Sequence, residues 1–192
     1  MQTRVINLSD INRREENGKL YLEGYFARFN EPYVVCEGWE ESIAPGAFAD
    51  CLASGDDVKA LWNHNADIVL GCTGNRTVLL SETASGLFGS IEINRNDSDA
   101  MNAYARILRK DVTGCSFGFD AEFEERMDTD GIYRTRINRV TKLYEISPCT
   151  FPAYESTSIA ARSRETLNEV RKDFAHRRRS AWQNEMRRKL KG

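Results

Sequence analysis

The stretch GCSFGFD pairs a hydroxyl group with two glycines and contains the first candidate for covalent chemistry. If this stretch is a strand, alternate side chains point to opposite faces. One face is apolar and must face the core: Cys115, Phe117 and Phe119. Ser116 and Gly118 share the other face, where a small neighbour leaves room for a substrate, so Ser116 is a candidate nucleophile. The alternatives are that Ser116 is an ordinary solvent-side serine and that Gly118 only marks a bulge. Cys115 is not expected to act, because a buried apolar cysteine is inert.

The chain has two histidines, and an imidazole is the usual proton carrier near neutral pH. His64, in LWNHNADIVLG, lies where an apolar strand gives way to a polar loop, a position where rigid scaffolds present reactive groups. His176 lies in the basic run AHRRR and is expected to be solvated. His64 is therefore the candidate general base, and the alternative is a structural histidine that only donates a hydrogen bond.

Glu145 lies in an otherwise apolar strand segment, and a buried carboxylate needs a partner. That partner is either a cation such as Arg139 or the ring N–H of His64. Asp67 and Asp120 are rival carboxylates that could orient the imidazole instead. The residues alone do not rank these three acids.

The elements that must position these groups are mostly short strands. Two-residue alternation predicts strands over 19–30, 58–64, 76–82, 86–94, 112–125 and 132–148, with a hairpin turn at 128–131. Helical spacing predicts helices over 44–55 and 96–110, the second capped by Asp97 or Ser98. We expect an α+β, mainly β fold, with an antiparallel β-barrel, peripheral helices and a C-terminal helical tail.

Composition excludes several classes of protein. The five cysteines are odd in number and lack a C-x-x-C pair, which argues against a disulfide framework, a structural zinc site and any transition-metal site. No apolar run reaches the length of a membrane span, and the N-terminus lacks the apolar stretch of a secretory signal. We expect no cofactor, no metal and no membrane partner.

Charge divides the chain in two. Residues 164–192 contain ten Lys/Arg and four Asp/Glu, a balance of +6, so the preceding residues have a net charge of −8. This segment is rich in Arg, Glu, Leu and Ala, and it predicts one long basic helix, or a helix that forms on binding. We therefore expect a β-barrel domain over 1–162 and a basic helical tail over 163–192.

Five motifs occur in order with comfortable spacing: ESIAPGAF, LWNHN…VLG, GLFGSIEI, GCSFGFD and LYEISPCTFPAY. Over about Gly24 to Ala161 the chain resembles the prohead proteases of tailed bacteriophages, which are serine peptidases distantly similar to herpesvirus assemblin. The resemblance implies that the N-H histidine, His64, is the base and that the S-x-G-F serine, Ser116, is the nucleophile. The herpesvirus branch uses a second histidine, which this body lacks, so the E-[IV]-S glutamate, Glu145, takes the third role.

The chemistry that the resemblance implies is acyl transfer. Ser116 would attack a peptide carbonyl, His64 would accept and return the proton, and Glu145 would hold the imidazole tautomer. The oxyanion donors could be backbone N–H groups at 117–118 or 150–153, or the side chain of Arg139.

The implied substrate is the major capsid protein with its scaffold segment, cut in the host cytoplasm inside the assembling procapsid. The implied partners also include a second copy of the chain, both as a substrate of autocleavage and in a homo-oligomer. Nucleic acid is not an expected partner, because the body is acidic and no recognition motif accompanies the tail. The competing hypothesis is a non-catalytic scaffold or assembly protein, in which Ser116 and His64 are incidental.

Overall fold

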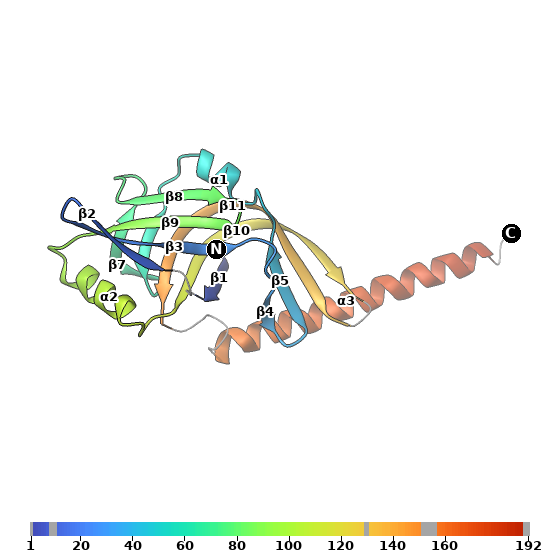
Figure 1. The fold of residues 1–192 in the computed structure, drawn as a ribbon. Coiled ribbons are helices and arrows are strands. Elements are labelled where there is room, and N and C mark those ends of the chain that lie inside the picture. The colour runs from blue at the N-terminus through green and yellow to red at the C-terminus, as the bar shows by residue number, and fades with distance from the viewer. Residues whose placement is uncertain (1, 8–10, 129–130, 151–156, 190–192) are drawn as a thin grey trace.

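The computed structural model describes residues 2–7, 11–128, 131–150 and 157–189, and its strands form two sheets (Figure 1). The larger sheet has the order β1-β10-β11-β5-β4, with β6 paired to β11 and β7 paired to β6. Its strands are β1 (Gln2–Asn7), β4 (Tyr33–Cys36), β5 (Trp39–Ile43), β6 (Lys59–Trp62), β7 (Asn65–Cys72), β10 (Gly114–Met127) and β11 (Tyr133–Cys149). The smaller sheet has the order β2-β3-β9-β8, from β2 (Asn12–Glu16), β3 (Lys19–Arg28), β8 (Val78–Thr83) and β9 (Gly86–Ile93).

Strand β11 organises the larger sheet. It pairs antiparallel with β10 along its length and parallel with two short strands, β5 at its beginning and β6 near its end. The parallel register sets Glu145 beside Lys59 and Ile146 beside Ala60. Strand β6 therefore runs in the same direction as the last residues of β11, and the turn after β6 lies next to the C-terminal end of β11.

The main core lies between the two sheets. Phe117, Phe119 and Ile146 of the larger sheet are fully buried, as are Leu22 and Ile91 of the smaller one. Aromatic rings contact one another within this core: the rings of Phe117 and Phe119 are tilted, with their centroids 4.8 Å apart. The predicted apolar face of the GCSFGFD stretch is thus the core face of β10.

Two short helices lie at the periphery of the sheets. In α1 (Ala49–Ala53) Cys51 is buried, and α2 (Ser98–Leu108) buries one apolar face on the main core. The carboxylate of Asp97 accepts hydrogen bonds from the backbone N–H groups of Asp99 and Ala100, so Asp97 caps α2.

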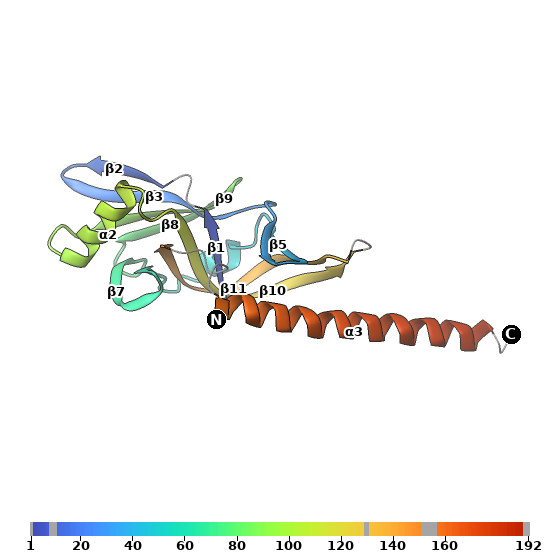
Figure 2. The same cartoon turned by 90° about the horizontal axis from the view of Figure 1, so that it is seen from below.

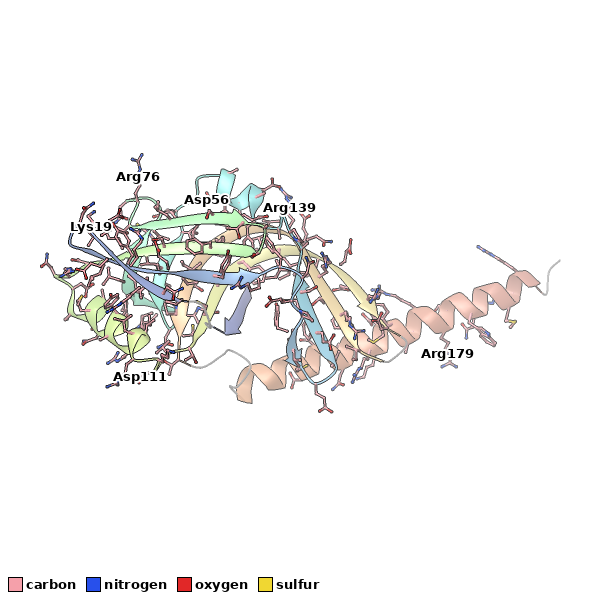
Figure 3. The ribbon with its side chains drawn as sticks, in the orientation of Figure 1. Lys19, Asp56, Arg76, Asp111, Arg139 and Arg179 are labelled. Atoms are coloured by element: carbon pink, nitrogen blue, oxygen red, sulfur yellow. The ribbon has the colours of Figure 1, made fainter. Side chains whose placement is uncertain are left out.

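The long helix α3 (Thr157–Lys189) forms a second, smaller core with the strand tips. Leu167 is buried with Cys36 and Tyr133, and Val170 and Phe174 pack around them. Figure 2 shows that the C-terminal half of α3 extends past the strands, where Arg179 projects from the helix (Figure 3). None of the helices in the described part of the chain is long and apolar enough to cross a membrane.

The structure confirms the part of the prediction that concerns the fold class, since the protein is α+β and mainly β. The strand pairings among the described residues make two sheets and do not close into a barrel, so the assemblin-like barrel stays a prediction. The predicted tail is helical, but the helix starts before residue 163 and runs across the expected boundary without a break. The division into 1–162 and 163–192 also stays a prediction.

Candidate active site

His64 lies in a two-residue turn between β6 and β7. Asn63 and His64 have φ values of +53° and +60°, as the tight turn of a hairpin requires, although neither is glycine. Such backbone is unfavourable for side chains and persists only where the surroundings hold it. The N–H of Asn63 donates to the carbonyl of Pro148 (3.1 Å), and its side-chain oxygen accepts from the N–H of Thr150 (2.8 Å). The N–H of His64 donates to Ser147 Oγ (3.3 Å), so the end of β11 holds the turn in place.

Glu145 and His64 form the centre of the site. Glu145 Oε1 lies 2.7 Å from His64 Nδ1, and the hydroxyl of Ser147 donates to the other carboxylate oxygen. The Glu145 side chain is 5% exposed and the His64 side chain 30% exposed, so the imidazole bridges a buried acid and the surface. A carboxylate only accepts, so the proton on this side belongs to Nδ1, and in the neutral imidazole Nε2 is then an acceptor. This is the tautomer that a general base needs.

Cys149 occupies the far side of the imidazole. Its Sγ lies 3.5 Å from His64 Nε2 and 3.4 Å from the carbonyl of Ser147, which accepts from the thiol. Burial, and after it the negative charge of Glu145, raises the pKa of the Cys149 thiol to about 12. The sulfur is therefore a neutral thiol at physiological pH. Sequence reasoning missed this neighbour, although two-residue spacing places Cys149 on the same face of β11 as Glu145 and Ser147.

Ser116 lies at the centre of the sheet. It pairs with Ser147 of β11 and with Val5 of β1, and its exposed fraction is 0%. Directly opposed residues of an antiparallel pair share a face, so Ser116 lies on the same face as Ser147 and Glu145. Its Oγ has no hydrogen-bond partner within the described part of the chain. The expectation of an open, substrate-sized space beside Ser116 is wrong for this conformation, because the residue is fully buried.

Gly118 has a more specific place than either sequence interpretation gave it. It lies directly opposite Glu145, and the register of β10 with β11 shifts between Gly118 and Phe119. Gly118 therefore precedes a bulge, as one alternative held.

The rival groups lie elsewhere. Asp67 is exposed on β7, and Asp120 accepts a hydrogen bond from the hydroxyl of Tyr144 (2.6 Å), which lowers the pKa of Asp120. Arg139 lies beside α1 (Figure 3), where its guanidinium pairs with Asp50 at 2.7 Å. The sequence left two possible partners for Glu145, Arg139 and His64. In the structure its partner is His64.

The remaining sequence candidates are also placed. Cys115 is fully buried in the core, and burial raises the pKa of its thiol well above the ordinary value. His176 is exposed on α3. Of the suggested oxyanion donors, Phe117 and Gly118 lie in a strand paired on both sides, and residues 151–153 lie outside the described residues. Among the described residues, no group of three His, Cys, Asp or Glu side chains could hold a metal ion.

Comparison with known proteins gives a family. The prohead protease of Enterobacteria phage HK97 is 31% identical over 144 residues, which are 73% of this chain and 59% of that protein. This chain therefore spans about three fifths of the length of that relative. The structure of the bacteriophage T4 capsid assembly protease matches with a TM-score of 0.54 at 13% identity, over 79% of this chain and 97% of that one, which is a likeness of fold. A family model described as caudovirus prohead serine protease matches residues 8–173. The chain belongs to the caudovirus prohead serine protease family.

Proposed function

We propose that this chain is a serine endopeptidase with Ser116 as nucleophile, His64 as general base and Glu145 as the carboxylate that orients the base. The observation that carries the proposal is the contact of the buried Glu145 carboxylate with His64 Nδ1, which leaves Nε2 of the neutral imidazole as a proton acceptor. Ser116 lies directly opposite Ser147, the residue that also contacts the backbone of His64. An imidazole oriented by a buried carboxylate can activate a serine hydroxyl for acyl transfer once the two groups are in contact.

In the reaction, Ser116 Oγ attacks the carbonyl carbon of a peptide bond while its proton passes to His64 Nε2. The imidazolium is stabilised by Glu145 and then protonates the leaving amine, and a water molecule repeats the sequence to release the acyl group. Nε2 contacts Cys149 in the present conformation, so the reacting form requires the hydroxyl of Ser116 to replace this thiol at Nε2. The unsatisfied Ser116 hydroxyl favours such a change, because a buried hydroxyl without a partner costs about 1–3 kcal/mol.

The family supports a proposal for the substrate. The relatives are named as a prohead protease and a capsid assembly protease, and we propose that this chain cuts the major capsid protein and its scaffold segment inside the assembling procapsid. We also propose autocleavage, self-association and a role for the basic α3 in recruitment to acidic partners. For the fold, we propose that the two sheets correspond to an opened version of the assemblin-like barrel.

The contact between Cys149 and His64 suggests an alternative nucleophile for the same peptidase reaction. Cys149, rather than Ser116, lies 3.5 Å from His64 Nε2, and a thiol beside an imidazole can also attack a carbonyl. Its raised pKa argues against this role, because reactive cysteines have lowered pKa values. Serine therefore remains the proposed nucleophile.

The test is co-expression with the major capsid protein of the same phage, followed by purification of the assembled particles. Ser116→Ala and His64→Ala are expected to leave the capsid protein at full length, whereas Cys149→Ala and Cys115→Ala still allow its cleavage. Mass spectrometry gives the cut positions, and a fluorophosphonate probe is expected to label Ser116 in wild-type particles. Cleavage by the Ser116→Ala variant with loss in Cys149→Ala would establish the thiol, and full-length capsid protein with the wild-type chain would indicate an assembly protein.

A further inference from the structure

Ser147 makes two hydrogen bonds within the candidate site. Its Oγ donates to Glu145 Oε2 and accepts the backbone N–H of His64 at 3.3 Å. Ser147 is fully buried, so water does not compete for either bond. One hydroxyl group therefore contacts the carboxylate and also the backbone of the residue whose imidazole that carboxylate binds.

The contact with Glu145 limits how the carboxylate can turn. Glu145 Oε1 accepts from the imidazole, and without Ser147 the second oxygen would have no donor among the described residues. A buried carboxylate oxygen that lacks a donor moves to find one, and the oxygen facing Nδ1 would move with it. The Ser147 hydroxyl thus directs Oε1 toward the imidazole.

The contact with His64 limits how the turn can move. His64 has a positive φ of +60°, a conformation that a histidine does not favour by itself. Accepting its N–H holds the turn against β11, at a residue that lies two positions from Glu145 on the same strand face. The positions of the imidazole and of the carboxylate therefore both depend on hydrogen bonds to one atom, Ser147 Oγ.

We propose that Ser147 is a positioning residue for the His64–Glu145 pair. This inference rests on the proposed function, because positioning matters only if the imidazole acts as a base. Ser147 does not touch the reacting atoms and acts through its two neighbours. Its removal should therefore lower the turnover number and leave substrate affinity unchanged, as expected for an interaction that matters only as the proton moves.

A matched control exists in the other sheet. Ser90 is also buried and donates from its Oγ to a glutamate, Glu23, at 2.8 Å. That pair has the same chemistry, but its carboxylate contacts Arg14 rather than an imidazole. Ser90→Ala therefore removes a comparable hydrogen bond between a serine and a glutamate, one that is partly buried, without touching the candidate site.

The first measurement is independent of proteolysis and uses nuclear magnetic resonance of the full chain. His64→Ala identifies the Nδ1–H signal of His64. In Ser147→Ala we expect exchange of this proton and of the His64 backbone amide with water to become at least about tenfold faster, since both lose a constraint. Ser90→Ala should leave both rates unchanged. Equal rates in wild type and Ser147→Ala would overturn the positioning role.

The second measurement is the rate of capsid protein cleavage in assembled particles. Ser147→Ala is expected to lower the maximal rate about 10–100-fold, and Ser90→Ala to leave it unchanged. In a Glu145→Gln background, Ser147→Ala should add little, because its effect passes through the lost carboxylate. An additive loss would overturn the proposal. If the wild-type chain cuts nothing, the proposed function fails while the exchange rates still decide whether Ser147 positions the pair.

Discussion

Replacing Glu145 by glutamine exchanges one carboxylate oxygen for an amide nitrogen and removes the charge that orients His64 in the proposed mechanism. The carboxylate accepts two hydrogen bonds, one from His64 Nδ1 at 2.7 Å and one from the hydroxyl of Ser147. An amide has one accepting oxygen and one donating nitrogen. If its nitrogen faces His64, the imidazole must accept at Nδ1, and its proton moves to Nε2. That tautomer cannot take a proton from Ser116.

The expected loss is large even in the better orientation. With the amide oxygen facing Nδ1 the tautomer is kept, but the imidazolium formed during the reaction loses its counter-charge in a largely buried pair. Loss of the orienting carboxylate in a serine triad lowers turnover by on the order of 10⁴, which corresponds to about 5 kcal/mol of transition-state stabilisation. We expect Glu145→Gln to lower the cleavage rate by about 10³–10⁴.

The assay is the time course of capsid protein cleavage in assembled particles, quantified by mass spectrometry. Asp67→Asn and Asp120→Asn are the controls, because one acid is exposed and the other is bonded to Tyr144. Both should cut within about threefold of the wild-type rate, and the unfolding midpoint of each variant shows whether it is folded. A Glu145→Gln rate within tenfold of wild type, or an equal loss in either control, would refute the assignment of Glu145.

Two further predictions concern stability. Burial raises the pKa of Cys51 to about 11 and that of Cys149 to about 12, from an ordinary value of 9.0, so above pH 9 the unfolded chain releases protons that the folded chain retains. The free energy of unfolding should therefore fall as pH rises from 9 to 11, by at most about 1.4 kcal/mol per pH unit for each thiol. Urea unfolding at several pH values measures this fall. If the free energy of unfolding falls with pH as steeply in Cys149→Ala as in wild type, the prediction is contradicted. Leu167→Ala should destabilise the docking of α3 by about 2–4 kcal/mol, and trypsin should then release α3 faster. The control is Trp182→Ala, at a 59% exposed residue, which should change the stability by less than about 0.5 kcal/mol. Equal rates of trypsin cleavage in the two variants would mean that α3 is an independent tail.

The elements that could be predicted were those with a complete local pattern. Residue alternation located β3, β9, β10 and β11 to within a few residues, because apolar side chains recur at every second position in much of each strand. The strands β4 and β5 were missed because four or five residues are too few to show a period, and β2 was missed because none of its residues is buried. The polar loop expected after the first apolar strand is instead a two-residue turn, Asn63 and His64, and β7 begins at Asn65.

The first helix shows how tertiary contacts change a local preference. Helical spacing predicts a helix over 44–55, but α1 contains only Ala49–Ala53. The carboxylate of Glu82 accepts from the backbone N–H groups of Gly46 (2.6 Å) and Phe48 (2.9 Å). These bonds hold the first residues as turns, and Glu82 belongs to β8, which no local pattern connects with this segment.

The sequence by itself determined which residues share a face and which residue types could do chemistry, because a strand's two-residue period and the acidity of a side chain are local properties. It placed Ser116 opposite the core face and required a partner for Glu145. Only the tertiary structure decided that the partner is His64, because the parallel pairing of β6 with β11 brings together residues 81 positions apart. It also decided that Ser116 is buried between paired strands and that Cys149 lies at Nε2, since strand neighbours are chosen by the packing of the whole core rather than by any one segment.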